Sequence, residues 1–143
     1  MVYLAQTDTT VGFLSNDDKK LAKIKGRDAK QKTLQVVDSF KNLTTITRVP
    51  KNRRKQLRRS KRTTYIYPNG LSFRVVEKHH IHNNLIKKYA CLYSTSANKT
   101  KKDFNESFAL KNADIILYTK DGFYESKSSS IYKITNKKRK RIR

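Results

Sequence analysis

The residues best suited to chemistry in this 143-residue chain are small hydroxyl residues placed near cations. A threonine-rich stretch, 7–10, follows a short apolar run, and Lys25 and Arg27 flank Gly26 farther along. The stretches 94–98 (STSAN) and 128–130 (SSS) lie beside other apolar runs. Hydroxyl and backbone N–H groups in such loops can bind phosphates or carboxylates, which the cations neutralise. Each group alone is more typical of a turn or a helix C-terminus, so their combination carries the argument.

Other kinds of catalytic or metal site find less support. The chain has four glycines and neither a GxxxxGK[ST] nor a GxGxxG phosphate loop. His79, His80 and His82 are clustered, and a metal on one helical face competes with a simpler interpretation, the solvated start of a helix before Ile81. The lone Cys91 excludes an intramolecular disulfide and a zinc site of several thiolates, and we expect a buried, inert thiol. We therefore predict no protein-coordinated metal.

The charge is concentrated in two runs. The chain has 34 Lys and Arg against 11 Asp and Glu, for a net charge of +23, and the segments 48–62 and 137–143 hold the excess. Such runs are typical of a surface that contacts the phosphate backbone of nucleic acid, although solvated basic faces are an alternative. An anionic membrane surface is disfavoured, because Leu57 is the only large apolar residue from Lys51 to Arg62. The candidate RNA-binding residues are Arg53, Arg54, Lys55, Arg58, Arg59, Lys61, Arg62, Lys138, Arg139, Lys140 and Arg141.

These residues need a scaffold of alternating strands and helices. The length suits one domain, 1–143, with a basic C-terminal tail at 136–143. We expect an α/β fold in which a twisted mixed sheet of about six or seven strands is flanked by helices. Strands are expected at 2–5, 33–37, 63–67, 71–76, 90–93, 114–118 and 131–135, and helices at 17–25, 50–59, 80–89 and 103–110. No apolar run could span a membrane and no export leader is apparent, so a cytoplasmic setting is expected.

The order of the short motifs resembles the YrdC-like family of threonylcarbamoyl-AMP synthases over essentially the whole chain. The matching strings are TDTxxG at 7–12, IKGR at 24–27, FRV at 73–75, STSAN at 94–98, ADIIL at 113–117 and SSI at 129–131. The pair formed by IKGR and STSAN is fairly specific. The resemblance implies a half-barrel sheet with a concave basic cavity. It also implies a nucleotidyltransferase that forms threonylcarbamoyl-adenylate and pyrophosphate from L-threonine, bicarbonate and ATP.

The resemblance further implies roles for individual residues and partners. The catalytic residues would be Lys25 and Arg27, and the ATP-binding residues Lys25, Arg27, Ser96, Asn98 and Arg143. The threonine-binding residues would be Thr9, Arg74 and Ser129. A Mg²⁺ ion would accompany ATP. The adenylate would serve the t6A modification of tRNA, so tRNA or another structured RNA and other proteins of that pathway are expected partners.

The sequence also departs from the family pattern. A Pro-Gly-Pro-x-Thr turn is replaced by the segment 60–64, in which only Thr64 remains. One alternative is therefore a catalytically degenerate YrdC-like protein that binds double-stranded RNA or tRNA. A ribosome-associated scaffold protein is a third possibility.

Overall fold

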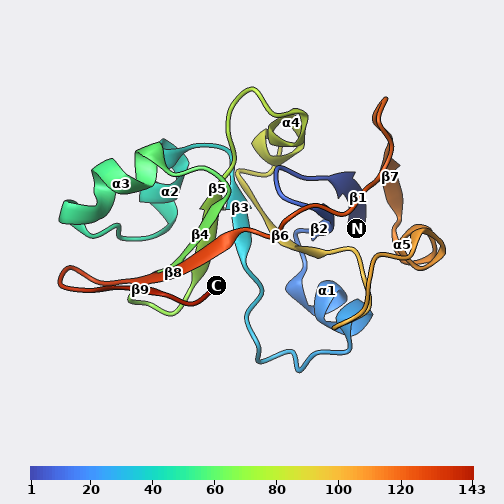
Figure 1. The fold of residues 1–143 in the computed structure, drawn as a ribbon, viewed down its shortest axis with the longest axis horizontal. Helices are drawn as coiled ribbons and strands as arrows, with labels where there is room; N and C mark the ends of the chain where they lie inside the picture. Colours follow the sequence, from blue (N-terminus) through green and yellow to red (C-terminus); the bar gives the residue numbers. More distant parts are fainter.

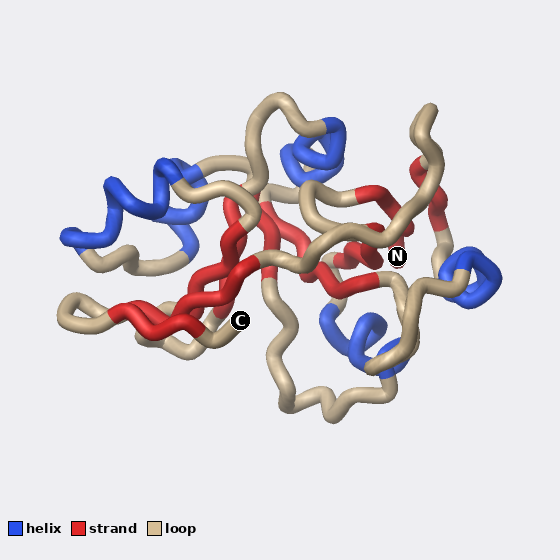
Figure 2. The backbone as a smooth tube through the Cα atoms, viewed as in Figure 1, coloured by secondary structure: helices blue, strands red, loops and turns tan.

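A single mixed sheet runs through the whole molecule (Figures 1 and 2). The computed structural model of the chain describes residues 1–143. The strand order is β7-β1-β2-β6-β3-β5-β4-β8-β9. The strands are β1 (Val2–Gln6), β2 (Val11–Ser15), β3 (Gln35–Val37), β4 (Thr63–Ile66), β5 (Ser72–Val75), β6 (Cys91–Ser96), β7 (Ile115–Leu117), β8 (Ser130–Ile134) and β9 (Arg139–Arg141). The α/β class is confirmed, and the expected count of six or seven strands is corrected to nine.

Five short helices cover the sheet. They are α1 (Asp18–Lys25), α2 (Phe40–Ile46), α3 (Arg54–Arg59), α4 (Ile81–Lys87) and α5 (Glu106–Asn112), and a 3₁₀ turn η1 (Lys51–Arg53) precedes α3. Figure 1 places α2 and α3 at one end of the molecule and α1 and α5 at the other. The longest of these helices, α1, has eight residues, and no helix is long and apolar enough to cross a membrane.

Side-chain alternation assigns the helices to the two faces of the sheet. In β1, Val2 and Leu4 pack in a cluster with Leu21 of α1, whereas Tyr3 and Ala5 pack in a cluster that contains Ile86 of α4. Successive side chains of a strand point to opposite faces. Helix α4 therefore lies on the face opposite α1.

The same alternation leaves polar side chains on the α4 face. Leu92 of β6 and Val76, just after β5, belong to the α4 cluster. Ser94 lies two residues after Leu92, and Arg74 lies two residues before Val76, so both point to that face. Since α4 covers only part of this face, it leaves room for a polar cavity beside it.

Capping of α1 fixes the stretch that carries two predicted site residues. The Asp17 carboxylate accepts the backbone N–H of Lys19 at 3.0 Å, which begins the helix. The helix ends at Gly26, whose φ of 64° lies in the left-handed region that glycine adopts without strain. Lys25 and Arg27 are thereby set on either side of a sharp change in chain direction.

Three elements were not expected from the sequence: β2, α2 and β9. Gly12, the last residue of the TDTxxG string, lies inside β2, opposite Ala5 of β1 and Ser96 of β6. The segment expected as a basic tail pairs antiparallel to β8, so that Tyr132 faces Arg141 and Ile134 faces Arg139. Main-chain pairing, which depends little on side-chain polarity, makes this strand.

Two expectations about local exposure are wrong. His82 is buried and not at a solvated helix start, whereas Ile81 is 70 % exposed. The cause is the position of α4, which turns Ile86 and His82 toward the sheet. Cys91 is half-buried and not fully buried, and burial raises the pKa of its thiol.

Candidate functional site

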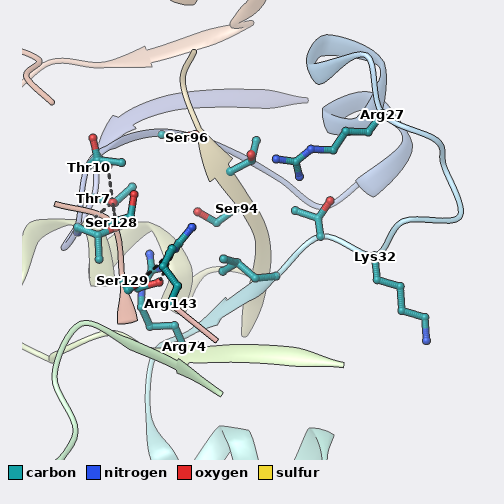
Figure 3. A pocket seen from close by; sticks show the side chains of 15 residues that line it. Thr7, Thr10, Arg27, Lys32, Arg74, Ser94, Ser96, Ser128, Ser129 and Arg143 are labelled. Carbon is teal, nitrogen blue, oxygen red and sulfur yellow. Dashed lines mark hydrogen bonds between the residues drawn. The ribbon is translucent and has the colours of Figure 1, made fainter. Parts of the chain in front are cut away.

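A polar cavity of about 140 Å³ lies among loops and strand ends contributed by six parts of the chain (Figure 3). Its lining contains hydroxyl and cationic side chains, no carboxylate and one apolar residue, Leu34. The lining residues are Thr7, Thr9, Thr10, Gly12, Arg27, Lys32, Thr33, Leu34, Arg74, Ser94, Thr95, Ser96, Ser128, Ser129 and Arg143. A site with this composition can neutralise an anion and supply hydrogen-bond donors to it.

Six of the eight residues predicted for catalysis and substrate binding line this cavity. They are Thr9, Arg27, Arg74, Ser96, Ser129 and Arg143. Asn98 lines a second cavity of about 190 Å³, which shares Thr10, Ser96 and Ser128 with the first and therefore adjoins it. Lys25 lines neither cavity.

Lys25, the last residue of α1, instead contacts the 96–98 loop, whose residues line the two cavities. Its Nζ donates to the backbone oxygens of Ser96 at 3.0 Å and Asn98 at 2.6 Å, and to Asn98 Oδ1 at 2.8 Å. Three donors thus meet at least three acceptors, and the ammonium is satisfied within the protein. Burial, together with the nearby charge of Arg27, lowers the pKa of Lys25 to about 8. The contact fixes the 96–98 loop, so in this geometry Lys25 positions the cavity wall.

Arg74 is held by a buried carboxylate from the loop between β1 and β2. Its Nε donates to both oxygens of Asp8 at 3.2 Å, and its Nη2 donates to Asp8 Oδ1 at 3.0 Å. The side chains of Arg74 and Asp8 are 3 % and 7 % exposed, so solvent screens this ion pair only weakly. The bidentate contact fixes the plane of the guanidinium, which lies at the cavity wall.

His82 packs against this ion pair from α4. Its Nδ1 is 3.8 Å from Asp8 Oδ1, and neither ring nitrogen has a hydrogen-bond partner. Burial lowers the pKa of His82 to about 3, with Asp8 opposing the shift and Arg74 adding to it. The imidazole is therefore neutral at physiological pH.

Arg143 follows β9, the strand that pairs with β8, and its side chain lines the cavity. Its Nε donates to the backbone oxygen of Ser129 at 3.1 Å, and the Ser129 hydroxyl lies 2.8 Å from that of Thr64. Figure 3 shows the side chains of Arg143 and Arg74 beside one another near Ser129. Burial and the charge of Arg74 lower the pKa of Arg143. Two guanidinium groups held this close create a strong preference for an anion between or above them.

Arg27 approaches the cavity from the other side. In Figure 3 it extends from the end of α1 toward Ser94 and Ser96, whereas the Lys32 side chain extends away from the other labelled cations. Arg27 has no acidic partner among the ion pairs of the chain. Its charge is thus available to a ligand, unlike that of Arg74.

Several residues of the site could not be selected from the sequence. Asp8 lay within a matched motif, but nothing in the chain pointed to its partner 66 positions away. Thr64, which contacts Ser129, was recognised only as a remnant of a lost turn. Ser94 and Ser128 also line the cavity, and the only sequence signal for them is that each lies in a stretch rich in hydroxyl residues.

The predicted RNA-binding residues lie outside the cavity lining. They are found on η1 and α3, between α3 and β4, and in the turn and strand that follow β8. Arg62 lies beside the cavity wall, because its Nη2 donates at 2.9 Å to the backbone oxygen of Lys127, next to the lining residue Ser128. No cluster of three His, Cys, Asp or Glu side chains that could hold a metal ion is present.

Comparisons with known proteins identify the fold. No protein-family model matches the chain, and no curated protein does. Among solved structures, a double variant of Sua5 from P. abyssi matches with a TM-score of 0.79 and 16 % identity over 99 % of this chain and 52 % of its own. P. abyssi Sua5 complexed with L-threonine matches with a TM-score of 0.78 and 16 % identity, over 99 % of this chain and 49 % of its own.

A third structure, the MTH1692 protein from Methanobacterium thermoautotrophicum, matches with a TM-score of 0.71 and 17 % identity, over 99 % of this chain and 79 % of its own. The chain thus spans about half the length of the Sua5 proteins. These matches confirm the YrdC-like fold expected from the sequence.

Proposed function

We propose that the chain forms threonylcarbamoyl-adenylate from L-threonine, bicarbonate and ATP, with release of pyrophosphate. The observation that supports this most is the meeting of Arg27, Arg74 and Arg143 in one cavity that contains no carboxylate. The reaction brings together a triphosphate, a carboxylate and bicarbonate, and these anions repel one another in water. A preorganised set of cations and hydroxyl donors offsets that repulsion.

The proposed reaction has two steps, and neither changes an oxidation state. The amino group of threonine attacks the carbon of bicarbonate, and loss of water leaves an N-carboxylate. An oxygen of that carboxylate then attacks the α-phosphorus of ATP, and the bond to the β-phosphate breaks to release pyrophosphate. Both steps concentrate negative charge on oxygen atoms, which is where guanidinium donors are most effective.

The two adjoining cavities suit the two halves of the reaction. Arg74, Ser129 and Thr9 would hold the threonine end, because a fixed guanidinium beside a hydroxyl matches an amino-acid carboxylate. Arg27 and Arg143 would contact phosphates. The second cavity is lined by Phe104 together with Asn98 and Glu125, and an aromatic side chain among polar groups suits a nucleoside base.

Lys25 would act indirectly, by holding the 96–98 loop. The adenylation step would depend on Lys25 because its hydrogen bonds place Ser96 and Asn98. Direct contact of its ammonium with ATP would require exchange of these hydrogen bonds. The first cavity offers no side-chain carboxylate to a metal, and Glu125 of the second accepts the backbone N–H of Phe104, so Mg²⁺ would be held mainly by the triphosphate and water.

The experiment is pyrophosphate release measured with each substrate omitted in turn. We expect release by the wild type only when threonine, bicarbonate and Mg-ATP are all present. Arg27→Gln should lower the rate by roughly 100-fold or more, which is typical for loss of one charge-stabilising donor. Lys25→Met should lower it as well. Lys23→Gln, an exposed change on the same helix, is the matched control and should leave the rate unchanged.

Two outcomes would overturn the proposal. The first is no release by the wild type together with no heat on mixing ATP and threonine with the protein. The second is equal rates for Arg27→Gln and Lys23→Gln. The first outcome would favour the catalytically degenerate alternative, in which the fold persists without adenylation.

A further inference from the structure

Strand β7 forms one edge of the sheet, and nothing in its sequence protects that edge. It pairs with β1 on one side, and no strand pairs with its other side. The segment 115–119 reads IILYT and contains no charge, proline or glycine. Charges and prolines are the usual features that keep an edge strand from pairing with another chain. The outer N–H and C=O groups of β7 are therefore available to a strand from outside the molecule.

Apolar side chains beside β7 are also left uncovered. Tyr118, directly after the strand, is 69 % exposed, and Ile81 of α4 is 70 % exposed. Ile81 and Leu85 line a groove of about 370 Å³ together with Leu117 of β7. The groove contains one cation, Lys88, and no carboxylate. A partner that paired with β7 would therefore satisfy backbone groups and would also remove apolar surface from water.

The charge of the chain allows two copies to approach at this edge. The segment 103–125, which contains α5 and β7, has five Asp and Glu against two Lys, a net charge of −3 in a chain of +23. Figure 1 shows α5 and β7 at the end of the molecule away from α3 and the β8–β9 hairpin, which carry the basic runs. Two copies that met through β7 would keep these runs far apart, and salt would screen their repulsion.

Strand β7 and the residues on either side of it are complementary to themselves when two copies run antiparallel. Asp114 and Lys120 flank the strand, both are exposed, and neither belongs to an ion pair within the chain. If Leu117 lies at a two-fold axis, Asp114 lies opposite Lys120 of the partner subunit. In the same register, Ile116 lies opposite Tyr118 of the partner subunit. Opposite residues of antiparallel strands share a face, where ion pairs and aromatic–aliphatic pairs are favourable.

We infer that two copies of this chain associate through β7, paired antiparallel about a two-fold axis, so that one sheet continues through a dimer. The axis makes each of the two side-chain contacts twice. A second copy fits this edge better than an unrelated strand does, because the acidic residue at one end and the basic residue at the other match their own reverse order. Strand β7 contributes no residue to either polar cavity, so the dimer leaves both linings intact.

The test exchanges the two flanking charges. In Lys120→Glu, a carboxylate faces Asp114 across the dimer, and in Asp114→Lys, an ammonium faces Lys120. Each variant alone therefore repels its own copy, whereas a mixture of the two variants restores both ion pairs in a heterodimer. Lys111→Glu, an exposed change on α5 with the same change in charge, is the matched control.

The fold of each variant is verified by circular dichroism. This matters most for Asp114→Lys, because Asp114 Oδ2 also accepts the backbone N–H of Val2 at 2.8 Å. Lys120 makes no hydrogen bond or ion pair that its replacement would break. The comparison of Lys120→Glu with Lys111→Glu therefore tests the inference even if Asp114→Lys does not fold.

Sedimentation equilibrium of nucleic-acid-free protein over a series of concentrations measures the Kd of the dimer. We expect the mass of the wild type to approach twice the 16.7 kDa of one chain. Lys120→Glu should raise the Kd by roughly 10-fold or more, since two favourable cross-strand pairs become like-charge pairs. The equimolar mixture of Lys120→Glu and Asp114→Lys should dimerise with a Kd close to that of the wild type. Lys111→Glu should leave the Kd unchanged.

The inference fails if the wild type is a monomer at every concentration or forms assemblies larger than a dimer. It also fails if Lys120→Glu and Lys111→Glu change the Kd equally, which would indicate a general effect of charge. Pyrophosphate release should be the same in Lys120→Glu as in the wild type, and Arg27→Gln should still dimerise. Failure of this inference is therefore distinguishable from failure of the proposed reaction.

Discussion

Asp8 decides how the charges of the cavity are shared. Its carboxylate is the acidic partner of Arg74 and of none of the other cavity cations. Arg74 is consequently fixed and largely neutralised, whereas Arg27 retains its charge for a ligand. One carboxylate thus distinguishes a guanidinium that is already paired within the protein, that of Arg74, from one whose charge is unpaired, that of Arg27.

His82 beside this pair makes the stability of the fold sensitive to acid. Its pKa is about 3 in the folded chain and about 6.5 when exposed, so the unfolded chain binds more protons between these values. The free energy of unfolding must therefore fall as the pH drops through this window. His82→Leu should flatten the decline of Tm between about pH 6.5 and 4.5 and leave Tm at pH 7 unchanged or higher, because an unpartnered buried imidazole is lost.

The matched control for this prediction is His79→Leu. His79 is exposed and lies 3.0 Å from Glu77, so its replacement should keep the decline with pH. Parallel curves for the wild type and His82→Leu would contradict the prediction.

At the scale of elements, turns were predictable and pairings were not. The expected strands at 63–67 and 71–76 form the hairpin of β4 and β5, and the Pro-Asn-Gly sequence between them makes its turn, in which Gly70 adopts a φ of 82°. Helix α2 was missed although Ser39 caps it by accepting the N–H of Asn42, since its threonines and asparagine carry weak helix propensity. Strand β9 was missed because its cations show no alternation with apolar residues.

Gly12 is a case in which packing, not turn geometry, requires glycine. A Cβ at this position would lie 3.0 Å from the backbone oxygen of Thr95 and 3.1 Å from Thr7 Cγ2. Both neighbours line the cavity, and the oxygen belongs to a paired strand that cannot shift freely. Gly12→Ala should therefore lower the free energy of unfolding by about 1–3 kcal/mol, measured in urea, and weaken nucleotide binding. An unchanged midpoint of urea unfolding would contradict this prediction and would mean that β6 can shift to accommodate the added Cβ.

At the scale of the molecule, the contacts that hold the cavity residues in place could not be predicted from the sequence. Six lining residues belong to the hydroxyl and cationic motifs, which lie at or beside the end of a strand or helix. The contact of Lys25 with the 96–98 loop and the pairing of Asp8 with Arg74 depend on the strand order, which places β6 between β2 and β3. Local patterns carry no information about such contacts.

A net charge of +23 predicts that anions stabilise the fold. A ligand at about 100 times its Kd contributes about 2.7 kcal/mol, which for this length corresponds to roughly 5–10 °C in Tm. Inorganic triphosphate should therefore raise Tm well beyond what chloride achieves at the same ionic strength, as measured by thermal unfolding. Equal shifts would indicate general screening without bound anions.

Strand β9 also has a consequence for solubility. It ends the sheet, and its outer backbone groups are free to pair with a strand of another copy. Arg139, Lys140 and Arg141 are all exposed along this edge, so two copies that approached edge to edge would bring six cations together. Repulsion between these cations therefore opposes the growth of an intermolecular β-sheet. A variant in which the three residues are replaced by neutral ones should aggregate when it is concentrated.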